Sequence, residues 1–88
     1  MEVTFTPSFF RSMKKFSKAL QEEIFEKIEF FRDPSNHKAL KVHKLGGGLR
    51  GSYSFSINHK IRVVFDYLPT KPQGVLLLVV GDHDVYNQ

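Results

Sequence analysis

Two segments in which apolar and polar residues alternate constrain the fold of this chain most. In Leu49–Ile57 and Ile61–Tyr67 the apolar side chains fall at odd positions, as expected of strands with one buried face. If Ile57 and Ile61 both face the core, the loop between them must have an odd number of residues, because an even number would reverse the phase. The alternation therefore predicts a hairpin with two cross-strand core pairs, Phe55 with Val63 and Tyr53 with Phe65.

The opposite phase of the same hairpin consists mostly of small and polar residues. It contains Arg50, Ser52, Ser54, Ser56, Arg62, Val64 and Asp66. In the predicted register Arg62 lies opposite Ser56 and Asp66 lies opposite Ser52. We expect helices to cover the apolar face, since their own apolar stripes need a partner, and the serine and arginine face to stay open.

Two helices are predicted between an N-terminal strand and this hairpin. Glu2–Thr6 alternates like a short strand, and Thr6 followed by Pro7 is a typical helix start. A second helix is expected from Ser17 to Arg32, ended by Asp33-Pro34. The apolar residues recur at helical spacing, and their aromatic rings are expected in the core: Phe9, Phe10, Met13 and Phe16 in the first helix, and Leu20, Ile24, Phe25, Ile28 and Phe31 in the second.

The last long apolar run, Val75–Val80, contains no polar residue and predicts a strand in the middle of the sheet, covered on most of both faces. We interpret Gly46–Gly48 as a hairpin connection, because no Lys-Ser or Lys-Thr pair follows as in a phosphate-binding loop. The predicted fold class is α+β: an N-terminal strand, two helices, then an antiparallel sheet with the helices packed on one face. A single domain is expected over residues 1–88.

Basic residues exceed acidic ones and are unevenly distributed. Lys and Arg number 13 and Asp and Glu number 9, a formal net charge of +4. No acidic residue occurs from Lys38 to Arg62. Such a segment commonly contacts phosphate, and about as commonly it is a solvated face that aids solubility. The absence of cysteine excludes disulfides and thiolate metal sites, and the N-terminus lacks a signal-peptide pattern. We expect a cytoplasmic protein with no membrane association.

Four polar side chains follow the apolar run and Gly81: Asp82, His83, Asp84 and Tyr86. A strand end is a rigid platform, and histidine can transfer a proton near neutral pH. The alternative is a solvated chain end without a role. Asp82-His83-Asp84 lacks the helical spacing of a zinc-protease site, and no Gly-x-Ser-x-Gly motif occurs, so we expect neither a metal nor acyl transfer. Metal-free RNA cleavage suits the residue types better, since it needs a base, an acid and cations on the phosphate.

The order of elements and several motifs resemble the RelE/ParE superfamily of type II toxin–antitoxin toxins. The resemblance covers nearly the whole chain and is strongest in His43–Leu45, Leu49–Ile57, Lys60–Phe65 and Leu78–Tyr86. It implies a toxin that cleaves messenger RNA in the decoding site of the ribosome, without cofactor or metal. It also implies a cognate antitoxin that neutralises the toxin. For a chain this basic, we expect an acidic or amphipathic antitoxin segment.

The resemblance also assigns roles to particular residues. His83 follows the strand-end glycine as a catalytic histidine does in the YafQ-like branch, and Arg62 stands where relatives bind phosphate. His43 matches a second functional histidine, and Tyr86 matches an aromatic residue that contacts a base. The predicted catalytic residues are therefore His83, Arg62, His43 and Tyr86. The predicted RNA- or phosphate-binding residues are Lys41, Lys44 and Arg50.

Structural alternatives exist for several of these residues. Arg62 could pair with Asp66 or Asp82, and the ring of Tyr86 could pack on the sheet. His37 and His59 look like loop residues without a special role. The tail after His83 is shorter than in many relatives, and Asp82 places a carboxylate where an anionic substrate would bind.

Two other functions remain open at the level of sequence, because one scaffold in this superfamily carries different activities. A ParE-like inhibitor of DNA gyrase would keep the fold and the basic surface without needing His83. An inactive member would retain only antitoxin binding. The concentration of titratable side chains at the strand ends favours a nuclease over both.

Overall fold

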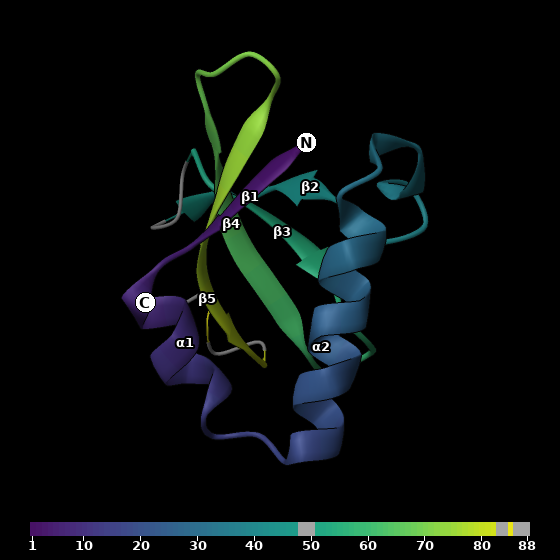
Figure 1. The fold of residues 1–88 in the computed structure, drawn as a ribbon, viewed down its shortest axis with the longest axis vertical. Coiled ribbons are helices and arrows are strands. Elements are labelled where there is room, and N and C mark those ends of the chain that lie inside the picture. Colours follow the sequence, from purple (N-terminus) through teal and green to yellow (C-terminus); the bar gives the residue numbers. More distant parts are fainter. Residues whose placement is uncertain (48–50, 83–84, 86–88) are drawn as a thin grey trace.

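The computed structural model describes residues 1–47, 51–82 and 85, and it confirms the predicted α+β class and order of elements (Figure 1). The elements in chain order are β1 (Glu2–Phe5), α1 (Pro7–Met13), α2 (Lys18–Phe31), the short 3-10 helix η1 (Pro34–Asn36), β2 (His43–Lys44), β3 (Tyr53–Ser56), β4 (Arg62–Leu68) and β5 (Gly74–Gly81).

All strands belong to one sheet with the order β1-β5-β4-β3-β2. The pairs β2–β3, β3–β4 and β4–β5 are antiparallel, whereas β1 pairs in parallel with β5. The sheet is thus mostly antiparallel, with one parallel edge pair that the sequence did not predict. The strand β5 lies between β1 and β4, as expected of a wholly apolar strand in the interior of a sheet.

The predicted hairpin register is confirmed. Phe55 pairs with Val63 and Tyr53 pairs with Phe65. The Ile57 amide donates to the Ile61 carbonyl at 2.9 Å, so the connection is the predicted loop 58–60. The regular strands are shorter than predicted, because β3 begins only at Tyr53, and the predicted residues Leu49 and Arg50 lie outside the described residues.

Hydroxyl groups cap both helices where the sequence places them. The Thr6 hydroxyl accepts from the Phe9 amide at 3.0 Å, and the Ser17 hydroxyl accepts from the Leu20 amide at 3.2 Å. The first helix ends at Met13, so Phe16 lies in the connection rather than in a helix as predicted. Each capping hydroxyl satisfies an amide that has no partner within its helix.

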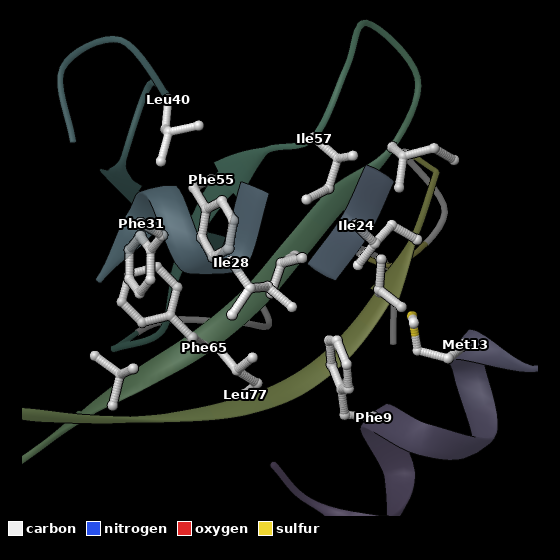
Figure 2. Close-up of a cluster of buried hydrophobic side chains, with 14 residues drawn as sticks. Phe9, Met13, Ile24, Ile28, Phe31, Leu40, Phe55, Ile57, Phe65 and Leu77 are labelled. Carbon is white, nitrogen blue, oxygen red and sulfur yellow. The ribbon is translucent and has the colours of Figure 1, made fainter. Parts of the chain in front are cut away.

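The core lies between α2 and the predicted apolar face of the sheet, as the close-up shows (Figure 2). Ile24, Ile28 and Phe31 of α2 are buried, and the ring of Phe31 stacks on Phe55 with centroids 4.2 Å apart. The helix α1 contributes Phe9 and Met13 to the same cluster. The expectation that all helical aromatic rings lie in the core is wrong for Phe10 and Phe25, which are 47% and 40% exposed.

A β-bulge in β5 explains why that strand carries no polar residue. Val64 pairs with Val79, but the next residue, Phe65, pairs with Leu77, so Leu78 is an extra residue in β5. The extra residue reverses the inside–outside phase of the strand. Leu77 before the bulge and Val80 after it are consequently both fully buried in the same core.

The predicted open face is wrong at its centre, where Ser54 and Val64 are 0% and 1% exposed. The helix α1 is the reason on one side, since it lies along the edge of β5 beyond the end of β1. Its Ser12 hydroxyl accepts from the Val80 amide at 3.0 Å and thereby takes the place of a neighbouring strand. On the other side, Val85 is buried against Gly81.

Candidate nucleic-acid interface

The candidate site lies where β4 begins and β5 ends. The sheet register pairs Arg62, the first residue of β4, with Gly81, the last residue of β5. Asp82 follows directly and is exposed. The predicted residues His83, Tyr86 and Arg50 lie outside the described residues, so their roles stay predictions.

The Arg62 side chain is partly buried and bonded to the turn that precedes β4. Its Nη1 donates to the carbonyl oxygens of Asn58 and Ile61, the latter at 3.2 Å. Asn58 in turn accepts the amides of Lys60 and Ile61 through Oδ1, each at 2.8 Å. Arg62 thus helps to hold the 58–61 turn, a structural role that the sequence did not reveal. The guanidinium group has more N–H donors than these two bonds use.

The predicted alternative in which Arg62 pairs with Asp66 is wrong. The Asp66 carboxylate accepts instead from the Ser52 hydroxyl at 2.6 Å, and Ser52 is its predicted cross-strand neighbour. The side chain of Arg62 is committed to the turn rather than to Asp66.

Arg62 and Lys41 line one surface pocket of about 340 Å³ between α2, the 39–41 segment and the 56–59 turn. Two further groups that can carry positive charge, Lys27 and His59, line the same pocket, with Glu23 as its acidic member. The structure thus brings together two of the seven predicted site residues. It also adds Lys27, and it gives His59 a place that the sequence reading denied it.

Lys41 owes its position to an unusual backbone conformation. Its φ of 58° lies in the left-handed region, which non-glycine residues adopt at a cost of about 1–2 kcal/mol. The chain turns sharply here, and the Val42 amide donates back to the His37 carbonyl at 3.0 Å. The Lys41 carbonyl then lies 2.9 Å from Nδ1 of His43.

This contact fixes the tautomer of neutral His43. A carbonyl oxygen only accepts, so Nδ1 must carry the hydrogen, and Nε2 keeps its lone pair. His43 is exposed, and its pairing with Ser54 places it on the sheet face opposite the core. The arrangement suits a general base, although neither His43 nor Lys44 lines the Arg62 pocket.

A second groove lies between α1 and the sheet face that carries Val64. Arg11 and Lys15 of α1 stand over a floor of apolar side chains, and Ser8 and Ser12 complete the wall. The floor consists of Val64, Leu78, Val79 and Val85. The sequence analysis missed both cations. The available signal was the polar stripe Ser8, Arg11, Ser12 and Lys15, which repeats at helical spacing opposite the apolar residues of α1.

His37 has a structural role, which corrects the reading of it as a featureless loop residue. Its Nε2 lies 2.8 Å from the Phe31 carbonyl, and its ring stacks on Phe31 with centroids 4.6 Å apart. It therefore supports the C-terminal end of α2 and does not line the pocket.

The pKa shifts that are resolved have structural causes. The Ser35 amide, which donates to Asp33, holds the pKa of that carboxyl below its ordinary value, and burial raises the pKa of the Tyr67 hydroxyl. Within residues 1–47, 51–82 and 85, no three or more side chains of the metal-binding types gather closely enough to hold a metal ion. None of the helices in those ranges is both long enough and apolar enough to cross a membrane.

Taken together, the fold and the pocket define a small basic α+β protein with cations at the ends of its central strands. No protein-family model matches the sequence, and no curated protein matches it either. Three solved structures match over almost their full length. They are the RelBE2 toxin–antitoxin complex from Mycobacterium tuberculosis (19% identity, TM-score 0.68, 93% of this chain and 96% of that chain), the YoeB–YefM complex from Staphylococcus aureus (25%, 0.69, 94% and 97%) and YafQ from E. coli (8%, 0.67, 96% and 94%).

The chain is thus a structural match to the RelE/YoeB/YafQ/ParE family of toxins from type II toxin–antitoxin systems. The resemblance inferred from the sequence motifs is confirmed at the level of the fold.

Proposed function

We propose that this protein is a cytoplasmic toxin that cleaves messenger RNA without a metal, with the message held in the decoding site of the ribosome. One observation carries the proposal. The sheet register sets Arg62 beside Gly81, two residues before His83, and Arg62 shares a pocket with Lys41. A phosphate-binding group and a histidine are thereby brought to the same end of the sheet.

In the proposed reaction the 2′-oxygen of the RNA attacks the adjacent phosphorus, and the bond to the 5′-oxygen breaks. The products are a 2′,3′-cyclic phosphate and a free 5′-hydroxyl, so no water or metal is consumed. His83 would protonate the departing 5′-oxygen, and His43, with its Nε2 lone pair, would accept the 2′-hydroxyl proton. Arg62 and Lys41 would meet the charge that builds on the phosphate, and Tyr86 would contact a base.

The remaining cations would bind the RNA backbone outside the reacting phosphate. Lys44 is exposed on the edge strand β2, and Arg50 stays a candidate from the sequence. Lys27 and His59 line the pocket and would add to its positive potential.

The experiment that tests this proposal is mapping of messenger-RNA cuts by primer extension after induced expression. Discrete cuts are expected with the wild-type chain and none with His83→Ala. A purified reaction with and without ribosomes decides whether the ribosome is required. If messages stay intact while growth stops, the proposal is wrong and inhibition of DNA gyrase becomes the function to test. Intact messages without growth arrest would indicate an inactive member.

We also propose a cognate antitoxin as partner, and the groove beside α1 as one of its docking places. Two of the matching structures are toxin–antitoxin complexes. Cations on one wall and an apolar floor suit an acidic peptide segment that carries apolar side chains.

Co-purification of the chain with its candidate antitoxin tests this docking place. Arg11→Glu together with Lys15→Glu is expected to weaken the complex, whereas Lys71→Glu, an exposed lysine far along the chain in the β4–β5 connection, should not. Equal loss with both variants would argue for a general charge effect, and no loss with either would place the antitoxin elsewhere.

A further inference from the structure

The exposed aromatic rings of α1 and α2 form one cluster with β1. Phe5 lies between the helices, with its ring centroid 5.4 Å from that of Phe10 and 6.1 Å from that of Phe25. Phe10 and Phe25 are large apolar side chains that stay 47% and 40% exposed. Figure 1 shows the two helices joined by a short connection, with β1 leading into α1. Contiguous exposed aromatic surface of this kind is typical of an interaction site.

The charges around this aromatic cluster are of opposite sign on its two halves. Lys14 follows Phe10 by four residues in helical conformation and therefore lies on the same side of α1. Glu22 and Glu26 line a shallow hollow around Phe25 on α2. Lys14, Glu22 and Glu26 are all exposed, and no ion pair engages any of them within the described part of the chain.

This surface is unsuited to nucleic acid but suited to a copy of itself. The glutamates of α2 would repel phosphate, so the surface is distinct from the basic pocket. A two-fold axis through an interface brings each half of a patch against the other half of the partner's patch. Such an axis through the aromatic cluster would set Lys14 of one copy near the glutamates of the other, twice over, with the phenylalanines between them.

We propose that this chain forms a two-fold symmetric homodimer through the cluster of Phe5, Phe10 and Phe25, with Lys14 facing the partner's α2 glutamates. The proposal does not depend on the proposed nuclease activity. It leaves the pocket of Arg62 and Lys41 outside the interface, because none of its lining residues belongs to the aromatic cluster.

Analytical ultracentrifugation of the full chain across a concentration series tests the dimer. The wild-type chain is expected to dimerise, and Phe25→Ser should weaken the dimer at least about tenfold, as loss of a central aromatic contact does. Phe30→Ser is the matched control, since Phe30 lies on the same helix, is 45% exposed and makes no ring contact with the cluster. It should change the dissociation constant by less than about threefold. Circular dichroism of each variant checks that it is folded.

A charge swap tests the two-fold arrangement itself. Lys14→Glu alone and Glu22→Lys alone should each weaken the dimer, because each sets like charges against one another. The double variant restores opposite charges in both copies and should return the affinity to near that of the wild type. A wild-type chain that is monomeric throughout, or equal effects of Phe25→Ser and Phe30→Ser, would overturn the dimer. Additive loss in the double charge variant would overturn the proposed symmetry.

Discussion

The core beneath α2 and the pocket at the strand ends are built in different ways. In the core, Phe65 contacts several other aromatic rings, so many side chains share each position. In the pocket, Arg62 and Lys41 come from two separate turns, and each turn depends on a few backbone hydrogen bonds. Redundant packing tolerates little loss of volume but holds the fold, whereas the pocket can lose its chemistry while the fold remains.

The largest effect is expected from emptying the core. Phe65→Ala removes a fully buried ring that contacts Phe31, Phe55 and Tyr67, and should lower the free energy of unfolding by about 3–5 kcal/mol. Urea denaturation measures this change. Phe30→Ala, which removes a ring of the same size from an exposed position, should change stability by less than about 0.5 kcal/mol. Similar losses at both positions would contradict the assignment of the core.

The pocket should respond in activity more than in stability. Arg62→Ala is expected to reduce RNA cleavage by about 10²–10³-fold, because a charge that stabilises the reacting phosphate is lost. Stability should fall by only about 1–3 kcal/mol, from the hydrogen bonds to the 58–61 turn. Arg32→Ala, which removes an arginine paired with Glu29 on α2, is the control for charge. Unchanged cleavage by Arg62→Ala would remove Arg62 from the proposed mechanism.

The junction of the two regions can be tested at Gly81. A Cβ atom there would lie 2.4 Å from Cγ1 of Val85, so Gly81→Ala must displace the segment that folds back over the strand end. We expect a loss of about 1–3 kcal/mol by thermal unfolding, together with reduced cleavage. Gly46→Ala is the matched control, since a Cβ atom at Gly46 meets nothing within 4 Å. Full stability of Gly81→Ala would show that the contact with Val85 is not as close as the geometry indicates.

Lys41 separates backbone strain from charge. Lys41→Gly relieves a left-handed residue and should raise stability by up to about 1 kcal/mol, while it removes one cation from the pocket. Binding of a short RNA, measured by fluorescence anisotropy, should weaken and lose part of its salt dependence. Lys38→Gly, at an exposed position nearby without positive φ, should not stabilise the chain. A loss of stability in Lys41→Gly would contradict the assigned strain.

The smallest effect is expected at Asp33, far from the pocket. The Ser35 amide holds the pKa of Asp33 below its ordinary value, so the carboxylate stabilises the native state at neutral pH and this contribution fades as acid protonates it. The melting temperature of Asp33→Ala should therefore lie slightly below that of the wild type at neutral pH. The two should converge as the pH falls through the carboxyl range. A difference that is independent of pH would contradict this role.

Much of the fold could be predicted because it follows from periodicity. The alternation in the two hairpin segments fixed the pairing of Phe55 with Val63, and the helical spacing of Ile24, Ile28 and Phe31 identified the buried side of α2. The exposure of Phe25 could not be predicted, since an aromatic residue beside an apolar stripe reads as part of it.

The candidate site was harder to predict because turns and not periodic elements build it. Arg62 was selected by its likeness to relatives, yet its bond to the Asn58 carbonyl depends on a turn whose shape the sequence does not reveal. Lys27 and His59 reach the pocket only through packing of α2 against the 56–59 turn. Arg11 and Lys15 reach their groove only because α1 lies along β5.

The sequence by itself determined the class of fold, the hairpin register and the buried side of α2, because these depend on short-range repeats of apolar residues. The tertiary structure decided the parallel pairing of β1, the bulge at Leu78 and the burial of Ser54. It also decided which cations share a pocket. These features depend on contacts between residues far apart in the chain, and no local pattern records such contacts.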